Sequence, residues 1–144
     1  MVAPGTALRE GLEDILHART GGMIVIADPD ELSFLFSGGI KIDVDYTPPL
    51  LYQVAKMDGA IILNANATKI AMANVQLTPD PTILSLETGT RHRTAERVSK
   101  QTDALVIAIS QRRQVVSLYV DGSKYMLEDI PVVLAKASPE SVAR

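Results

Sequence analysis

The sequence predicts a mixed α/β fold, in which a central, mixed and twisted β-sheet is flanked by helices on both faces. Two short apolar runs, MIVIA at residues 23–27 and ALVIAI at 104–109, are typical of strands buried on both faces. Segments with helical spacing alternate with such runs, so a helical layer is expected on each side of the sheet. The 144 residues are about the length of one domain.

The first half of the chain begins with an amphipathic helix. Its apolar side chains recur at helical spacing over residues 7–20, and two glycines follow as a stop signal. The strand at 23–27 comes next. After it we expect a turn at 28–30, a loop at 37–39, a short edge strand at 40–44, and a helix that begins at Pro48-Pro49 and continues to Met57.

The second half is expected to contain two hairpins. Two β-like runs within residues 60–77 surround Asn64-Ala65-Asn66-Ala67, and asparagine tolerates turn conformations. A long proline-containing loop follows over 78–90. The remaining elements should be a helix at 94–102, a hairpin of 104–109 with 115–120, a tight turn at Asp121-Gly122, and a helix at 130–137. The domain is expected to cover residues 1–138, and 139–144 to be a frayed tail or the start of a linker to further domains.

Composition excludes several classes of function. The net charge of −3 gives no overall attraction to a nucleic-acid duplex or an anionic membrane, although a local basic cluster could bind a small anion. The absence of cysteine excludes thiol catalysis, zinc ribbons and iron–sulfur clusters. No apolar run approaches the roughly 20 residues of a membrane span, so a cytoplasmic location is expected.

The first candidate site is the segment ETGTRHRTAER at residues 87–97. It combines a glycine, two threonines and two arginines at the expected start of a helix, and helix N-termini attract anions. Guanidinium groups match phosphate oxygens with paired donors. The residues concerned are Gly89, Thr90, Arg91, His92, Arg93 and Thr94. The segment is therefore either a phosphate cradle or a solvated basic turn paired with Glu87 and Glu96.

The second candidate, Asp58-Gly59-Ala60, stands between the helix that begins at Pro48-Pro49 and a strand. Magnesium needs only one or two carboxylates when a nucleotide supplies further oxygens, so Asp58 could hold a cation. Gly59 would let the backbone approach a bulky ligand, and Ala60 would keep the pocket floor low. The alternative is an ordinary Asp-Gly turn.

The third candidate is Ser110-Gln111-Arg112-Arg113, directly after the apolar strand ALVIAI. Ligand crevices form at strand ends in open α/β sheets, so a hydroxyl and two guanidiniums there could complete a triphosphate site. The alternative is a basic hairpin tip that faces water.

In this order and spacing, the three motifs resemble those of the diadenylate cyclase domain, a family that makes cyclic di-AMP from ATP. The resemblance extends from the first helix to the last hairpin. The serine-then-arginines hairpin followed by VVSLY is most similar to the DNA-integrity scanning (DisA) subfamily. In that subfamily a helical spine and a DNA-binding domain follow the cyclase domain, so DNA binding is expected only through domains absent from this chain.

The resemblance implies a role for each matching residue. Asp58 would hold Mg²⁺ or Mn²⁺ near the α-phosphate and help the ribose 3′-hydroxyl lose its proton. Arg91 and Arg93 would order phosphates, and His92 would position the cluster or assist the metal. The remaining contacts to ATP would come from Gly59 and Ala60 on ribose and base, the backbone of Leu77 on the adenine edge, Gly89, Thr90 and Thr94 on the nucleotide, and Ser110, Arg112 and Arg113 on the β- and γ-phosphates. Gln111 departs from the charged residue of some relatives, which leaves the number of phosphate-binding arginines open.

The same resemblance implies self-association. In the family, two ATP molecules react across two domains that face each other, so a homo-oligomer is expected, with an octamer expected only for a full-length parent. Two other hypotheses are a silent module that binds ATP or cyclic di-AMP, and a structural oligomerisation domain without nucleotide affinity.

Overall fold

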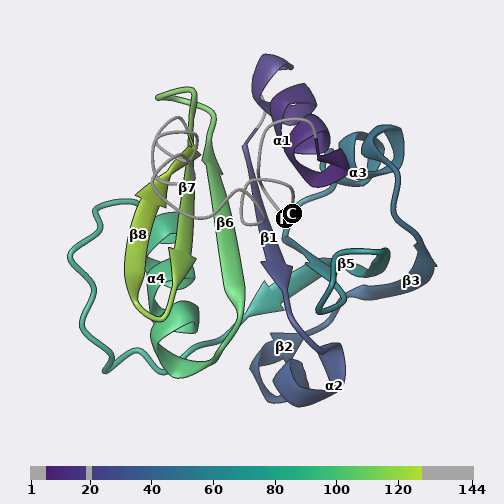
Figure 1. Cartoon of the computed structure of the whole chain (residues 1–144). Helices are drawn as coiled ribbons and strands as arrows, with labels where there is room; N and C mark the ends of the chain where they lie inside the picture. The colour runs from purple at the N-terminus through teal and green to yellow at the C-terminus, as the bar shows by residue number, and fades with distance from the viewer. Residues whose placement is uncertain (1–5, 19–20, 128–144) are drawn as a thin grey trace, which may run out of the picture.

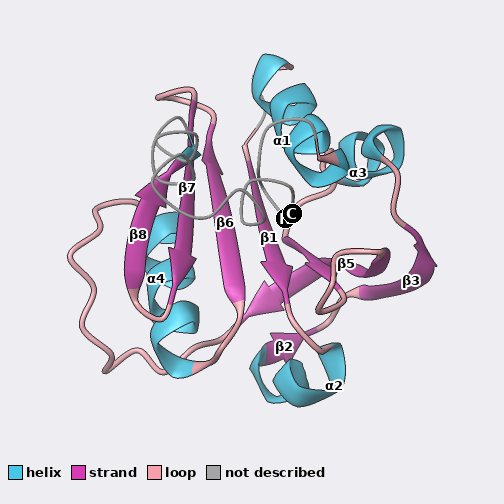
Figure 2. Cartoon of the chain, in the orientation of Figure 1, coloured by secondary structure: helices cyan, strands magenta, loops and turns pink. Residues whose placement is uncertain are grey.

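A mixed β-sheet of eight strands forms the centre of the computed structural model, which describes residues 6–18 and 21–127 (Figures 1 and 2). The strands are β1 (Gly22–Ile26), β2 (Phe36–Ser37), β3 (Ile40–Asp45), β4 (Ala60–Leu63), β5 (Lys69–Leu77), β6 (Leu105–Ser110), β7 (Val115–Val120) and β8 (Ser123–Met126). The helices are α1 (Ala7–His17), α2 (Pro29–Leu32), the 3₁₀ turn η1 (Ser33–Leu35), α3 (Pro48–Val54) and α4 (Thr90–Gln101).

The strand order is β2-β5-β4-β1-β6-β7-β8, and β3 also pairs with β5. β1 runs parallel to β4 and antiparallel to β6, so the sheet is mixed. β2 and β3 lie one after the other along the outer edge of β5, and β3 thereby confirms the expected edge strand. The register places Met23 beside Ala60 and Gly22 beside Ile109. The beginnings of β1 and β4 and the end of β6 therefore lie together, at the edge of the sheet where these strands start or finish.

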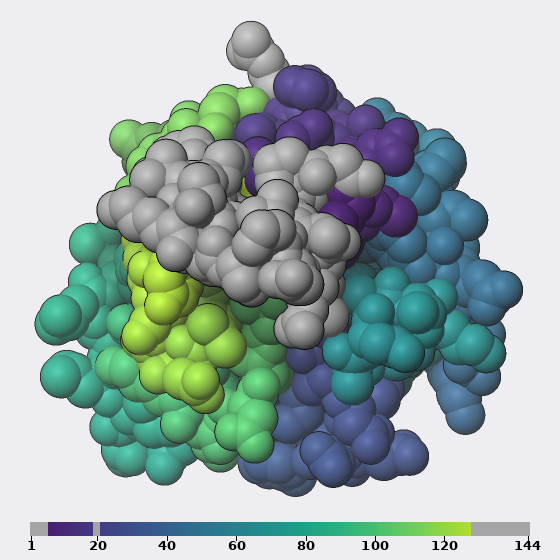
Figure 3. All heavy atoms as spheres, viewed as in Figure 1, coloured from purple at the N-terminus to yellow at the C-terminus, as the bar shows by residue number. Residues whose placement is uncertain are grey.

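Helices cover both faces of this sheet, which confirms the predicted fold class. Alternate residues of β1 point to opposite sides, so Ile24 packs with α1 and α3, whereas Val25 packs with α2, η1 and α4. Leu12 of α1 and Leu51 of α3 are completely buried in the hydrophobic core on the Ile24 side of the sheet. Figure 3 shows α1 in purple and β8 in yellow on the same face of the molecule. None of the helices in the described ranges has the length and apolar character that a membrane crossing requires.

Both predicted hairpins are present. Asn64 Oδ1 accepts hydrogen bonds from the backbone N–H groups of Thr68 (2.8 Å) and Lys69 (3.0 Å), which closes the turn between β4 and β5. β6 and β7 pair across residues 111–114 as expected. Asp121 and Gly122 both have positive φ (51° and 79°), the conformation of a two-residue hairpin turn, and they lead into β8.

Several elements differ from the prediction. β8, β2 and α2 were not expected; α2 exists because Asp28 Oδ1 accepts from Asp30 N–H and Pro29 occupies the first helical position. α1 ends at His17 and α3 at Val54, both earlier than expected. α4 begins at Thr90 instead of residue 94. Its N-cap is Gly89, which has no side chain to cap the helix. The helix expected at 130–137 and the tail at 139–144 lie outside the described residues.

Candidate functional site

The start of α4 and the end of β6 meet at the edge where β1 begins. Arg91 Nη1 donates a hydrogen bond of 3.0 Å to the carbonyl oxygen of Ile109, the residue before Ser110. The same guanidinium lies against Gly21, where a Cβ atom would overlap it. The basic segment and the serine-arginine hairpin, 18 residues apart at this contact, therefore lie next to each other.

Two neighbouring cavities open at this edge. The α4–β6 cavity, of about 580 Å³, is lined by Gly89, Thr90, Arg91, His92, Ser110, Gln111 and Arg112. The β4–β5 cavity, of about 320 Å³, is lined by Met23, Gly59, Ala60, Val75, Gln76, Leu77, Thr90, Arg91 and Thr94. Thr90 and Arg91 line both cavities. One elongated ligand could therefore extend from one cavity into the other past Thr90 and Arg91.

The Asp58-Gly59-Ala60 turn is fixed by β5. Gly59 has φ +87°, and a Cβ there would lie 2.9 Å from both the carbonyl carbon of Asn74 and the backbone nitrogen of Val75. Asn74 itself has φ +55°, at a point where the β4–β5 register shifts by one residue. This bulge makes room for the glycine and presents Ala60, which is 3% exposed, as the floor of the β4–β5 cavity.

A divalent cation fits this turn only if a nucleotide is bound with it. Asp58 is exposed and lies outside both cavity linings, although the next residue, Gly59, lines the β4–β5 cavity. Within residues 6–18 and 21–127 no group of three or more acidic, histidine or cysteine side chains could hold a metal. One carboxylate with phosphate oxygens and water is a common arrangement for Mg²⁺. The donor set is therefore compatible with a cation that arrives with the nucleotide.

The carboxylates near the basic segment have other partners. Glu87 pairs with Lys124 of β8 at 2.8 Å, and Glu96 pairs with Lys100 at 4.0 Å. The expected pairing of this basic turn with Glu87 and Glu96 is therefore wrong, although Arg91 and Arg93 are exposed as a solvated turn requires. Within the part of the chain that the structure describes, the guanidinium groups of Arg91 and Arg93 have no carboxylate partner. Positive charge at a helix N-terminus opposes the helix dipole, so an anionic ligand would stabilise it.

Four predicted site residues behave differently from expectation. Arg93 lies outside both cavity linings and donates from Nη2 to Thr88 O at 2.7 Å. Arg113 also lies outside both linings, although its backbone N–H donates to Ser110 Oγ at 3.2 Å. The Thr94 hydroxyl donates to Thr90 O (3.0 Å), so it would have to rotate to donate to a ligand. Gly89 has an ordinary extended backbone (φ −88°), a conformation that does not require glycine.

His92 is a buried residue in the lining of the α4–β6 cavity. Its side chain is packed edge-on against Tyr119, with 6.5 Å between ring centroids, and the residue is 5% exposed. Burial lowers the pKa of His92, and the positive charge of Arg113 lowers it further. Among the described residues, Nε2 of His92 has no hydrogen-bond partner. An unpartnered buried nitrogen in a cavity wall is a feature that a bound ligand or water would satisfy.

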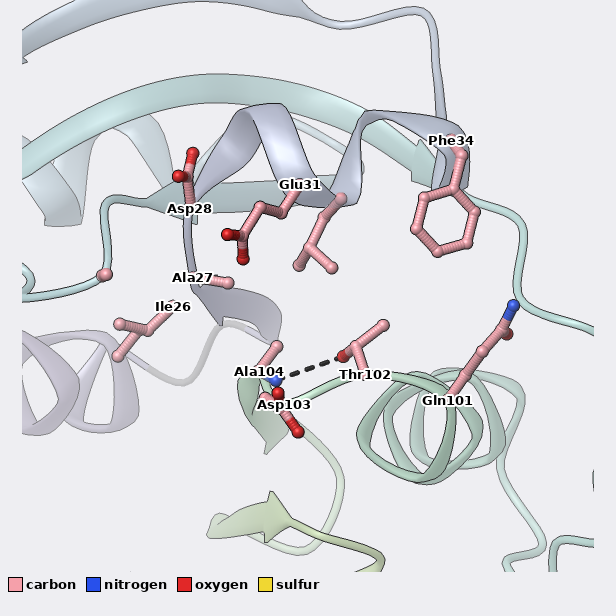
Figure 4. A pocket seen from close by; sticks show the side chains of 11 residues that line it. Ile26, Ala27, Asp28, Glu31, Phe34, Gln101, Thr102, Asp103 and Ala104 are labelled. Carbon is pink, nitrogen blue, oxygen red and sulfur yellow. Dashed lines mark hydrogen bonds between the residues drawn. The ribbon is translucent and has the colours of Figure 1, made fainter.

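A third cavity lies at the opposite end of β1 and has the wrong charge for a phosphate. Its volume is about 540 Å³, Asp28 and Glu31 belong to its lining, and Figure 4 shows the Glu31 carboxylate pointing toward the α4–β6 connection. Asp103 adds a third carboxylate, and the lining contains no lysine or arginine. Like charges repel the anionic part of a nucleotide, so the two cavities that share Arg91 are the better candidates.

Sequence reasoning missed some residues of the site. Gly21 was interpreted only as a helix stop, although it forms the surface on which Arg91 lies. Met23, Val75 and Gln76 line the β4–β5 cavity. The parallel pairing of β1 with β4 brings Met23 to Ala60, and no local sequence signal indicates that contact.

Comparison with known proteins agrees with this geometry. A protein-family model described as "DisA bacterial checkpoint controller nucleotide-binding" (DAC) matches residues 9–124. The chain is 61% identical over 137 residues to the DNA integrity scanning protein DisA of Carboxydothermus hydrogenoformans and 58% identical over 137 residues to that of Symbiobacterium thermophilum. Each match covers 95% of this chain but 39% of the relative, so the chain spans well under half of the length of these curated relatives.

Solved structures show the same fold. The crystal structure of DacA from Staphylococcus aureus superposes with a TM-score of 0.68 at 25% identity, covering 90% of this chain and 91% of that one. A hypothetical membrane spanning protein from Bacillus cereus gives a TM-score of 0.72 at 25% identity, covering 83% of this chain and 61% of the other. On the family match and the identity to the DisA proteins together, the chain belongs to the diadenylate cyclase (DAC) domain family, in its DisA branch.

Proposed function

We propose that this chain condenses two ATP molecules into one cyclic di-AMP and two pyrophosphates. The observation that carries the proposal is the pair of adjoining cavities that share Thr90 and Arg91. The β4–β5 cavity combines apolar residues such as Ala60, Val75 and Leu77 with polar ones, a mixture that suits a base and ribose. The α4–β6 cavity combines a helix N-terminus with Ser110 and Arg112, a combination that suits phosphates.

In the proposed reaction, each ribose 3′-hydroxyl attacks the α-phosphorus of the other nucleotide. A new phosphorus–oxygen bond forms, the bond to the β-phosphate breaks, and pyrophosphate leaves with the electron pair. The nucleophile and the leaving group both belong to the substrate, so the protein contributes mainly alignment and charge neutralisation. Good alignment alone is worth roughly 7–11 kcal/mol, so a poorly assembled pair of sites should bind ATP without turning it over.

The residues divide this work between them. Gly59, Ala60 and the backbone of Leu77 bind ribose and base. Arg91, Arg112 and Ser110 hold phosphate oxygens, with Arg93 and Arg113 closing over them from outside the cavity. Asp58, the neighbour of Gly59, would hold Mg²⁺ or Mn²⁺ together with phosphate oxygens, and the cation would neutralise charge at the reacting phosphate. His92 stays neutral and fixes the back wall.

The proposal requires two copies of the site to face each other. One cavity pair holds one nucleotide, and the second nucleotide would come from another copy of the chain. The test is to incubate the purified chain with ATP and Mn²⁺ or Mg²⁺ over a protein concentration series, while measuring oligomer mass and cyclic di-AMP by mass spectrometry on the same samples. We expect product per chain to increase with the associated fraction. An associated sample that binds ATP but releases no pyrophosphate would instead support a silent binding module, and the absence of any ATP affinity would support a structural role.

A further inference from the structure

Glu87 lies at the point where three elements around His92 meet. Its Oε1 accepts one hydrogen bond of 2.8 Å from the hydroxyl of Tyr119 on β7 and one of 2.8 Å from Lys124 Nζ on β8. The Glu87 side chain is 15% exposed. A carboxylate in such a position is costly unless it is paired and hydrogen-bonded, and here both donors converge on the same oxygen.

Tyr119 connects this carboxylate to the cavity wall. The residue is completely buried, its hydroxyl donates to Glu87, and the edge of its ring contacts His92. Lys124 Nζ also lies 5.9 Å from the centre of the Tyr119 ring. The hydroxyl of Tyr119 is therefore held by Glu87, and its ring contacts the imidazole of His92. A change at Glu87 could thus move the tyrosine ring against the histidine.

Glu87 also anchors the loop that leads into α4, one residue before Thr88, whose carbonyl oxygen accepts from Arg93 Nη2. Figure 2 shows this loop running outside the helix, and side chains of α4 hold it: Arg97 Nε donates to Ile83 O (2.9 Å), Lys100 Nζ to Leu84 O (2.8 Å), and Glu96 Oε1 accepts from Leu86 N–H (3.1 Å). These three contacts join the loop to its own helix. Glu87 is different, because it joins the loop to the sheet two residues before the N-cap Gly89.

The start of α4 needs such an anchor. Gly89 offers no capping side chain, and the first turn contains Arg91 and Arg93, whose charges oppose the helix dipole. Thr90 and Arg91, which line both cavities, therefore depend on contacts outside the helix for their position.

We infer that Glu87 is a positioning residue of the site: by binding Tyr119 and Lys124 it fixes the entry of α4 and the contact of Tyr119 with His92. The kinetic part of this inference rests on the proposed cyclase function, whereas the structural part does not. Two measurements on the full 144-residue chain separate them.

The kinetic measurement compares Glu87→Ala, Tyr119→Phe and the double variant. Tyr119→Phe retains the ring against His92 and removes only the hydroxyl. Each single variant removes a hydrogen bond to a charged group, so each should lower kcat/KM by at least about tenfold. The loss should appear in kcat, with KM within about threefold, and the double variant should be little worse than either single one because both remove the same contact.

Glu96→Gln is the matched control, since Glu96 anchors the same loop through Leu86 without touching Tyr119. It should change kcat/KM by less than about twofold. Equal losses in Glu96→Gln and Glu87→Ala would overturn the inference in favour of general loop stability. So would full additivity of Glu87→Ala and Tyr119→Phe.

The second measurement needs no ATP. The chain has two histidines, so the imidazole Cε1–H spectrum contains a signal from His92 and one from His17. Glu87→Ala and the milder Glu87→Gln should shift the His92 signal and leave that of His17 in place, while Glu96→Gln should move neither. An unchanged His92 signal in folded Glu87→Ala would overturn the inference even if the chain makes cyclic di-AMP. Unfolding of both Glu87 variants would also overturn it, because the residue would then be structural.

Discussion

The guanidinium of Arg91 lies on the Cα of Gly21, so closely that a methyl group on this glycine would overlap Nη1. Neither Gly21 nor its neighbour Gly22 has a positive φ, and a Cβ on Gly22 would meet no atom within 4 Å. The two adjacent glycines therefore offer a matched pair of substitutions.

Gly21→Ala should displace Arg91 from both cavities with little effect on the fold, because the overlapping atom is the end of a flexible side chain. We expect kcat/KM to fall by about tenfold or more, since small displacements of aligned groups are costly in catalysis. The free energy of unfolding should change by less than about 1 kcal/mol in Gly21→Ala and in the control Gly22→Ala. Steady-state kinetics and urea denaturation check both values. Equal activity in the two variants would remove Gly21 from the site.

Gly59→Ala should destabilise the chain as well as inactivate it. The backbone there has φ +87° and the new Cβ would meet backbone atoms of Asn74 and Val75, which cannot move as a side chain can. A loss of about 2–3 kcal/mol is expected in chemical denaturation. Gly38→Ala is the control, because Gly38 has φ +67° with nothing within 4 Å of its Cβ; it should lose only about 1 kcal/mol. If both variants lost the same free energy of unfolding, the contact of Gly59 with β5 would be unimportant.

Asp58→Asn should abolish product while preserving the fold. The residue is exposed at a turn, so its replacement should change the free energy of unfolding by less than about 0.5 kcal/mol. Loss of the carboxylate should lower the rate of cyclic di-AMP formation by at least about a hundredfold. Asp103→Asn, in the acid-lined cavity, should leave the rate unchanged. A normal rate in Asp58→Asn would remove this residue from the mechanism, and a low rate in Asp103→Asn would point to the other cavity.

The stability of the chain should decrease as the pH falls below about 6.5, the ordinary pKa of histidine. Burial and the charges of Arg113, Lys124 and Arg91 lower the pKa of His92, whereas Glu87 alone among these neighbours raises it. The unfolded chain therefore binds a proton at a higher pH than the folded chain does, and protonation favours unfolding. An NMR titration of the metal-free protein should give a His92 midpoint below 6.5, and denaturation at pH 7.5 and 5.5 should show the loss of stability. A midpoint above 6.5 would contradict the assignment of His92 as a buried neutral group.

The sequence was sufficient for the longer strands, because a continuous apolar run is a local pattern, but it missed the short strands β2 and β8. The three motifs were grouped through the resemblance to a known family. Continuous apolar runs identified β1 and β6, and the turn residues Asn64 and Asp121-Gly122 identified where chains reverse. The start of α4 was placed four residues late because Gly89 lacks the capping side chain that usually indicates a helix start.

Contacts distant in sequence could not be predicted in the same way. Nothing in the residues around Gly21 indicates that Arg91 will lie on it, since this contact depends on the antiparallel pairing of β1 with β6. Glu87 was assigned to the basic cluster because it is near that cluster in the sequence. In the folded chain, β8, which lacks a clear apolar run, brings Lys124 to it instead.

The most direct test of the proposed site is a crystal structure of the chain with a non-hydrolysable ATP analogue and Mg²⁺ or Mn²⁺. We expect the base and ribose in the β4–β5 cavity above Ala60, the phosphates in the α4–β6 cavity beside Arg91 and Ser110, and the cation between Asp58 and the phosphates. A nucleotide bound in the cavity of Asp28, Glu31 and Asp103, or anywhere away from both Asp58 and Arg91, would contradict the account.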